Sequence, residues 1–131
     1  SQAGVKIDLI VRGICCLIPG RKYSRNIRVT RIVDTFLEHA RVWYFGNGGK
    51  PKLFLGSPDW MRRNLYRRIE AVTPILDPDL KRELSDMLSI QLSDKRKACF
   101  VDDHLRNRWK SARPQKEKIR SQYTFYEYLK G

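Results

Sequence analysis

The chain has few cysteines, no long apolar run and too few acids to balance its bases. Its three cysteines, Cys15, Cys16 and Cys99, include an adjacent pair and no Cys-x-x-Cys motif. They therefore form neither a disulfide framework nor a zinc site of usual spacing. No apolar stretch approaches the ~18–20 residues of a membrane span, and no secretion leader is visible. The cysteine usage favours a reducing, cytoplasmic setting.

Basic residues dominate the composition. The chain carries 27 Lys and Arg against 14 Asp and Glu, which gives 131 residues a formal net charge of +13. Such a surplus attracts polyanions through its long-range field. Nucleic acid, anionic lipid, nucleotides and inorganic polyphosphate all remain candidates. The net charge indicates a polyanionic partner but does not distinguish among these four.

Short apolar segments alternate with amphipathic ones along the chain. The pattern predicts strands at Val5–Val11 (a central strand), Ile27–Ile32, His39–Phe45, Lys50–Gly56, Ile69–Pro74 and Ala98–Val101, the last of them. It predicts a single helical turn at Asp34–Glu38 with Asp34 as its cap, a short helix or bend at Trp60–Arg68, and a capped amphipathic helix from Asp77-Pro78 to Leu92. The basic segment Ser111–Gln122 runs into a terminal helix, with Ile119, Tyr123, Tyr126 and Leu129 along one side. We expect one α/β domain spanning residues 1–131, with residues 1–4 as a possible linker.

The strand-like run HARVWYF contains one of only two histidines in the chain. Alternate side chains of a strand share a face, so His39 and Arg41 would point the same way, about 7 Å apart. An arginine as fixed cation beside a histidine that gives or takes a proton can grip a phosphate. Arg12 follows another predicted strand, and Ser57 and Asn64 follow the second strand of the pair. A histidine satisfied by a backbone group is the structural alternative for His39.

Two further motifs have structural explanations that weigh more. The loop Gly46-Asn47-Gly48-Gly49-Lys50 lacks the Ser or Thr and the helix that a P-loop requires, because Pro51 and a strand-like run follow it, so a hairpin turn is expected. His104 follows two acids, as in some metal sites, but no second ligand stands at useful spacing. We therefore expect a surface histidine.

Four segments carry a family resemblance: VRGICCLIPG, SRNIRVTRIVDTFLEHARVWYFGNGG, LFLGSPDWMRRNLYRRIE and PILDPDLKRELSDMLSIQLSDKRKA. They resemble the C-terminal portion of bacterial polyphosphate kinase, the histidine-phosphorylating type, from about Val5 to the end of the chain. The resemblance implies the second of two phospholipase-D-like domains, a mixed β-sheet flanked by helices. It implies reversible transfer of the terminal phosphoryl group of ATP to polyphosphate, with Mg²⁺, through a phosphorylated histidine in the first such domain, which nothing here matches.

The resemblance also implies roles for individual residues. Arg12 in VRG falls on the family's ATP-phosphate-binding arginine. His39 in FLEH falls on its second active-site histidine, which contacts nucleotide phosphate and is proposed to assist transfer. Arg41 occupies the lysine place of the broader His-x-Lys signature, and Ser57 belongs to its Gly-Ser. No metal ligand is expected among these residues.

Two positions depart from the phospholipase-D signature. Gly46 stands where an Asp is expected, and Trp60 stands where the signature has Asn, with Asn64 as a substitute by hypothesis. A phosphate-binding half-site that is inert alone is therefore expected, rather than a stand-alone phosphodiesterase. The alternatives are a basic module that binds nucleic acid or another polyanion, and a phosphodiesterase formed by two paired copies.

The expected partners follow from the same resemblance. They are ATP and ADP, inorganic polyphosphate, the remaining domains of the same chain and further copies in a homo-oligomer, with no specific nucleic acid. The resemblance places the protein in the cytoplasm, either free or peripheral to the inner membrane.

Overall fold

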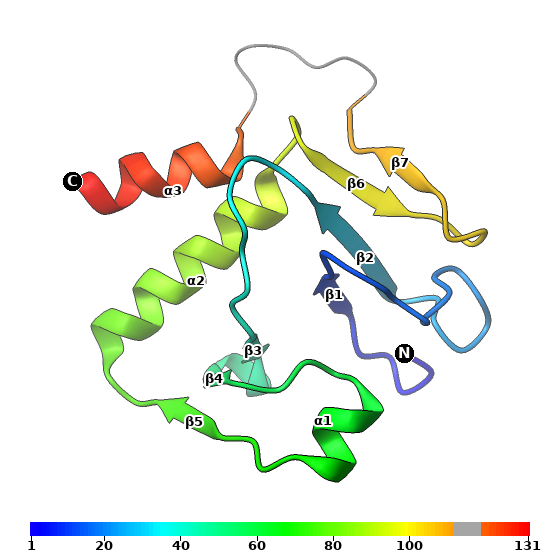
Figure 1. The fold of residues 1–131 in the computed structure, drawn as a ribbon, viewed down its shortest axis with the longest axis horizontal. Helices are drawn as coiled ribbons and strands as arrows, with labels where there is room; N and C mark the ends of the chain where they lie inside the picture. Colours follow the sequence, from blue (N-terminus) through cyan, green and yellow to red (C-terminus); the bar gives the residue numbers. More distant parts are fainter. Residues whose placement is uncertain (112–118) are drawn as a thin grey trace. The chain divides into compact units, whose positions relative to one another are not determined.

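The computed structural model describes residues 1–111 and 119–131, and the chain divides into two compact units. Unit 1 comprises residues 1–36 and 88–131, and unit 2 comprises residues 37–87. The expected basic segment Ser111–Gln122 falls largely on residues 112–118, outside the described residues. Figure 1 shows the elements in chain order: β1 (Ile7–Ile10), β2 (Ile27–Ile32), β3 (Val42–Phe45), η1 (Asn47–Gly49), β4 (Lys52–Gly56), α1 (Arg62–Arg67), β5 (Val72–Ile75), α2 (Pro78–Ser93), β6 (Ala98–Val101), β7 (Asn107–Trp109) and α3 (Ser121–Lys130).

Unit 1 is built on a mixed sheet with strand order β1-β2-β6-β7 (Figure 1). β1 pairs with β2 in parallel, while the β2–β6 and β6–β7 pairs are antiparallel. The predicted α/β class and mixed sheet are confirmed. β1 lies at the edge of the described sheet, so its expected central place is wrong. β7 was not predicted, because its three residues are all exposed and carry no apolar alternation.

The core of unit 1 lies where β2 meets β6. The apolar side chains buried there are Val29, Ile32, Ala98, Cys99 and Val101. β2 has the bounds expected from its sequence, because its apolar positions alternate with polar ones as a half-buried strand requires.

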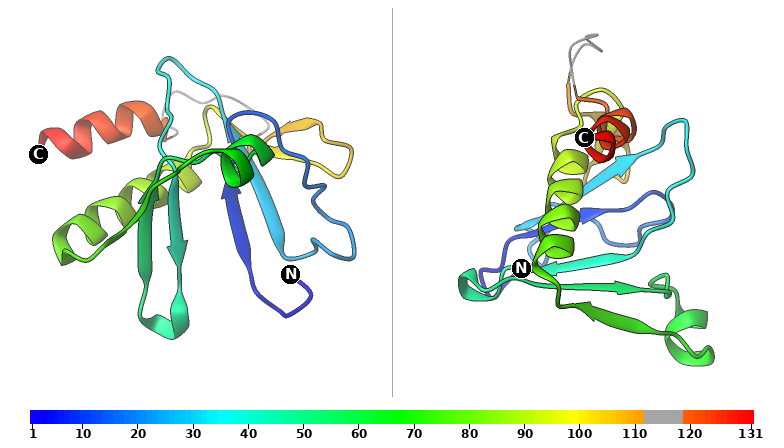
Figure 2. Two further views of the ribbon diagram at one scale, coloured as in Figure 1. Left: turned by 60° about the horizontal axis from the view of Figure 1, so that its bottom comes forward. Right: turned by 90° about the vertical axis from the view of Figure 1, so that its left-hand side faces the viewer.

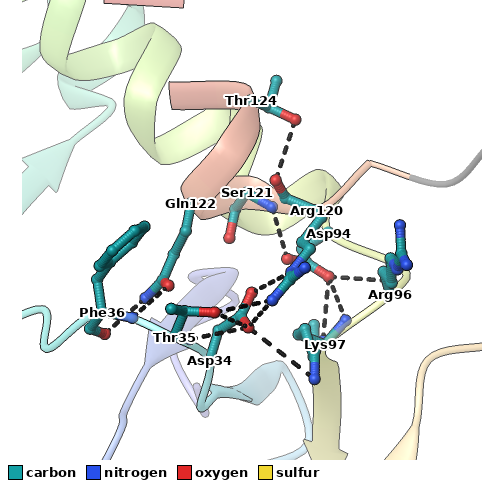
Figure 3. Close-up of polar contacts among 11 residues, drawn as sticks. Asp34, Thr35, Phe36, Asp94, Arg96, Lys97, Arg120, Ser121, Gln122 and Thr124 are labelled. Carbon is teal, nitrogen blue, oxygen red and sulfur yellow. Dashed lines mark hydrogen bonds and ion pairs between the residues drawn. The ribbon is translucent and has the colours of Figure 1, made fainter. Parts of the chain in front are cut away.

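An ion pair joins the end of β2 to the start of α3. Nε and Nη2 of Arg120 donate to the two carboxylate oxygens of Asp34 at 2.8 and 2.6 Å, and Lys97 Nζ lies 3.9 Å from the same carboxylate (Figure 3). Asp34 does not cap a helix: Thr35 and Phe36 form a bend and no helix occurs in residues 34–38, so the expected helical turn is wrong. The nearby Gln122 side chain bonds both the N–H and the carbonyl of Phe36, at 2.8 and 2.7 Å.

A second buried carboxylate, Asp94, fixes the turn between α2 and β6. Its Oδ1 accepts three backbone N–H groups, those of Arg96, Lys97 and Ala98, at 2.8, 2.7 and 3.1 Å. Its Oδ2 accepts the N–H of Ser121 at 2.8 Å (Figure 3). Asp94 is 0% exposed, so these four bonds replace its hydration. The first residue of α3 is thereby bonded to the end of α2.

Acidification should loosen α3. The hydrogen bond from Arg120 is the main reason why the pKa of Asp34 lies below its usual 3.8. A lowered carboxyl pKa stabilises the fold above the unfolded value and the stabilisation is lost as the pH falls through the folded value, here from about pH 4 downward. We expect hydrogen-exchange protection of the α3 amides, corrected for the intrinsic rate, to fall over that range. Arg120→Gln should weaken this dependence, and an unchanged dependence in the variant would contradict it.

Unit 2 contains an antiparallel sheet of order β3-β4-β5. Figure 2 shows the β3–β4 hairpin, whose turn is the glycine-rich loop. Asn47, Gly48 and Gly49 have φ of 45°, 60° and 87°, a backbone region that glycine adopts without strain. The predicted hairpin is confirmed, but β3 begins at Val42, so the expected strand start at His39 is wrong.

The helices follow their local signals. α1 confirms the expected short helix within Trp60–Arg68. At the start of α2, Asp77 Oδ1 accepts the N–H groups of Asp79 and Leu80 at 2.8 and 2.9 Å, as a capping residue does. Among the described helices, none combines the length and the apolar character that a membrane crossing requires.

Many large apolar side chains are exposed in both units. Tyr123, Tyr126 and Leu129, expected to line one side of the terminal helix, are 45%, 63% and 58% exposed. In unit 2, Trp60 and Tyr66 are 77% and 80% exposed. Exposed apolar surface of this extent is typical of faces that contact other protein.

Candidate active site

The β3–β4 hairpin brings the residues before β3 beside the residues after β4. In its register Val42 pairs with Leu55, and the N–H of Gly56 donates to the carbonyl of Arg41 at 3.1 Å. Continuing this register backward places His39 beside the segment that follows Gly56. The hairpin therefore assembles a polar site at one end of its two strands.

Three side chains meet at this end. Arg41 Nη2 lies 2.8 Å from His39 Nε2, and Arg41 Nε donates to Asp59 Oδ1 at 3.0 Å. The same carboxylate oxygen is 3.6 Å from His39 Nε2. The side chains of His39, Arg41 and Asp59 are 56%, 25% and 38% exposed, so the guanidinium is the most enclosed of the three. The predicted pairing of His39 with Arg41 is present, and closer than the 7 Å expected from strand spacing.

This geometry fixes which atoms of the group donate and which accept hydrogen bonds. A guanidinium can only donate, so Nε2 of His39 must accept and the proton of the neutral ring lies on Nδ1. The hydrogen bond from Arg41 is the main reason why the pKa of Asp59 lies below its usual 3.8, so the carboxylate is ionised at neutral pH. Nδ1 is then the ring nitrogen that can donate to a phosphoryl oxygen.

Ser57 joins β4 to the approach of β5. Its hydroxyl donates to a carboxylate oxygen of Glu70 and accepts the N–H of Ala71 at 3.1 Å, while its own N–H donates to the Ala71 carbonyl at 2.9 Å. These bonds hold the two segments together. Contact of Ser57 with a phosphate stays a prediction.

Asn64 supports the site from within α1. It is 4% exposed, and its Nδ2 donates to the backbone carbonyl of Asp59 at 3.2 Å. Its Oδ1 is buried without a hydrogen-bond partner among the described residues. Asn64 thus fixes the turn that carries Asp59, and contact with a phosphate stays a prediction.

Arg12 belongs to unit 1, where it follows β1 by two residues. The ladder extends one residue past the strand, since the N–H of Val11 donates to the carbonyl of Thr30 at 2.9 Å. Arg12 itself is exposed. Its role in binding ATP phosphate stays a prediction.

Comparison with protein families identifies the chain. The model for "Polyphosphate kinase C-terminal domain 2" matches residues 1–122. The chain belongs to the polyphosphate kinase C-terminal domain 2 family. The predicted family is therefore confirmed, over nearly the whole sequence.

Individual polyphosphate kinases show how much of the longer proteins this domain represents. The chain is 47% identical to polyphosphate kinase from Escherichia coli (strain K12) over 132 aligned residues, covering 100% of the chain and 19% of that protein. It is 59% identical to polyphosphate kinase from Synechocystis over 99 residues, covering 75% of the chain and 14% of that protein. The crystal structure of polyphosphate kinase from Porphyromonas gingivalis matches with a TM-score of 0.94 and 58% identity, over 99% of the chain and 20% of that structure. The chain thus spans at most about a fifth of these relatives.

Among the residues that the structure describes, the one cluster of three potential metal ligands is Asp102, Asp103 and His104, in unit 1. Asp102 already accepts hydrogen bonds from the Nε atoms of Arg106 and Arg108 at 3.0 and 2.9 Å. The expected exposed histidine is confirmed for His104, whose side chain is 63% exposed.

Asp59 is the site residue that the sequence patterns did not reveal. It lies two residues after Ser57, in a turn that carried no expectation of chemistry. The hairpin register contained the signal, because it places the residues after Gly56 beside those before Val42.

Substituting Gly56, the last residue of β4, tests how closely the three strands of unit 2 pack beside the site. A Cβ at Gly56 would lie 2.6 and 2.8 Å from ring atoms of Trp43 and 2.9 Å from Val72 Cγ2. Gly56→Ala should therefore destabilise unit 2 by about 1–3 kcal/mol, the usual cost of overpacking. Gly46→Ala is the matched control, since that position has φ −64° and nothing within 4 Å. Equal thermal stability of the two variants would contradict this expectation.

Proposed function

We propose that this domain forms the ATP-phosphate-binding half of a polyphosphate kinase active site, while the histidine that becomes phosphorylated lies elsewhere in the longer polypeptide. The observation that carries the proposal is the contact of His39 with Arg41, at 2.8 Å, in a member of this family. A guanidinium beside a neutral imidazole supplies both fixed positive charge and a ring N–H. We further propose that the domain has the phospholipase-D-like fold.

Phosphoryl transfer asks a protein mainly for positioning and for stabilisation of charge on the transferred group. In the proposed reaction, a histidine nitrogen outside this chain attacks the γ-phosphorus, the bond to the β–γ bridging oxygen breaks, and ADP leaves with the electron pair. The terminal oxygen of polyphosphate then attacks the phosphorus and the N–P bond breaks. Arg41 binds phosphoryl oxygens with its remaining N–H groups, and His39 donates from Nδ1. For Arg12, binding to ATP phosphate is proposed from the family resemblance of the VRG motif alone.

Magnesium is proposed to arrive with the nucleotide phosphates. Mg²⁺ commonly binds one or two carboxylates together with substrate phosphates. The carboxylate beside His39 is that of Asp59, which Arg41 already engages at 3.0 Å. This carboxylate is therefore poorly suited to bind the ion, and the ion is held by the nucleotide that carries it.

The proposed partners fit the surface of the domain. Polyphosphate carries about one negative charge per phosphate. This domain, with a net charge of +13, should therefore bind it with strong salt dependence, as basic proteins bind nucleic acid. The exposed apolar faces suit packing against the remaining domains and against other copies in a homo-oligomer. The proposed location is the cytoplasm, either free or peripheral to the inner membrane.

Mapping the phosphorylated residue tests whether the nucleophilic histidine lies outside this domain. The full-length protein is incubated with ATP labelled at the γ-phosphate, digested under alkaline conditions that preserve phosphohistidine, and the labelled peptide is sequenced. We expect the label outside residues 1–131, with none on His39 or His104. Stoichiometric label on His39 would make this domain the source of the nucleophile and overturn the proposal.

A further inference from the structure

We propose that Asp59 is the positioning residue of this site: its carboxylate holds the Arg41 guanidinium against the His39 ring, so that both present one fixed set of donors to a phosphoryl group. This inference rests on the proposed function, because it concerns how the same site is ordered.

The first support is that the Arg41 guanidinium bridges the other two side chains. Its Nε donates to Asp59 Oδ1 at 3.0 Å and its Nη2 donates to His39 Nε2 at 2.8 Å, so that these two acceptors, 3.6 Å apart, face the same guanidinium. A guanidinium has five N–H donors, and these contacts use one on Nε and one on Nη2. Three donors remain for a phosphate, in a plane that the two contacts fix.

The second support is that Asp59 is itself held from behind. Its backbone carbonyl accepts the N–H of Met61 at 2.7 Å and Nδ2 of Asn64 at 3.2 Å. Asn64 is 4% exposed and belongs to α1, so its amide is anchored in the fold. α1 therefore fixes the backbone of Asp59, and the side chain of Asp59 in turn fixes the guanidinium of Arg41 beside His39. None of the bonds that hold the Asp59 backbone involves its carboxylate.

The third support is the charge of Asp59. An ionised carboxylate repels a phosphate, so Asp59 is unsuited to bind substrate directly. It also offsets the positive charge of Arg41 and should weaken rather than strengthen nucleotide binding. If Asp59 opposes nucleotide binding but positions Arg41, its removal should have a specific kinetic effect: kcat falls, while KM is unchanged or lower.

The test uses four variants of the full-length enzyme: Asp59→Ala, Asp59→Asn, Arg41→Ala and the double variant that combines Arg41→Ala with Asp59→Ala. Asp59→Ala removes the acceptor for Arg41 Nε, and we expect kcat to fall about 10- to 100-fold, as misplacement of a reacting group does, without a rise in KM for ATP. Asp59→Asn keeps an acceptor oxygen in the same place, so it should retain several-fold more activity than Asp59→Ala. In an Arg41→Ala background, Asp59→Ala should lower kcat by less than about 3-fold, because residues that act as a unit are not additive.

Each other result would overturn the inference. Full activity of Asp59→Ala would show that the carboxylate orders nothing. The same fractional loss with and without Arg41 would show that Asp59 acts on the fold alone. Equal activities of the Ala and Asn variants would show that charge matters and position does not. Failure of the proposed function looks different: His39→Ala and Arg41→Ala would then turn over normally, whatever Asp59 does.

Discussion

Alanine in place of His39 should lower polyphosphate synthesis by the full-length enzyme at least about 100-fold, the usual effect of losing a positioned acid–base group. Arg12→Ala should have an effect of the same order, because a donor aimed at developing phosphoryl charge contributes about as much. The reason lies in the geometry for His39, whose Nε2 is taken by Arg41 and whose Nδ1 is left to donate. For Arg12 the reason is the family resemblance of the VRG motif. Initial rates at saturating ATP measure both.

Matched controls separate these roles from general effects of charge and exposure. His104→Ala removes the other histidine, which is also exposed and paired with a carboxylate, here Asp103 at 2.9 Å. Arg25→Ala removes another exposed arginine of unit 1 and so the same charge. Both controls should keep more than half of the wild-type rate. Near-normal turnover with His39→Ala or Arg12→Ala would reject the role of that residue.

Alanine in place of Asp94 should be the most destabilising single substitution considered. It leaves the N–H groups of Arg96, Lys97, Ala98 and Ser121 without their acceptor, in a place where Asp94 is 0% exposed. We expect a loss of about 3–5 kcal/mol of unfolding free energy, the scale of breaking a buried network that includes a charged partner. Hydrogen exchange of peptides covering 94–101 and 119–131 should show strong loss of protection.

Two comparisons make the Asp94 prediction specific. Asp94→Asn keeps Oδ1 for three of the N–H groups but can turn an amide N–H₂ toward Ser121, so its loss should be intermediate. Asp103→Ala removes an exposed carboxylate of the same unit and should cost less than about 1 kcal/mol. Wild-type protection in Asp94→Ala would mean that the observed bonds do not stabilise the α2–β6 turn.

Features set by near neighbours in the sequence were predictable. β2 follows from alternating apolar positions, the start of α2 follows from Asp77-Pro78, and the hairpin follows from Gly46 to Gly49. In each case the residues that determine the structure lie within a few positions of it. The family resemblance added the identity of the site residues, which local patterns alone leave open between core and active site.

Features set by distant partners were not predictable from local patterns. Asp34 looked like a helix cap, but its carboxylate is bonded to Arg120, 86 residues further along the chain. β7 is short and exposed, and only its pairing with β6 defines it. The expected 7 Å between His39 and Arg41 assumed a strand repeat, whereas both residues precede β3 and their side chains are in contact at 2.8 Å.

The central claim is that the His39 and Arg41 side chains together bind the γ-phosphate of ATP without a covalent bond to it. A crystal structure of the full-length enzyme with a non-hydrolysable ATP analogue tests it most directly. We expect γ-phosphate oxygens at about 3 Å from a His39 ring nitrogen and from the Arg41 guanidinium, which is hydrogen-bonding distance. An analogue fully bound with its phosphates away from both side chains would contradict the account.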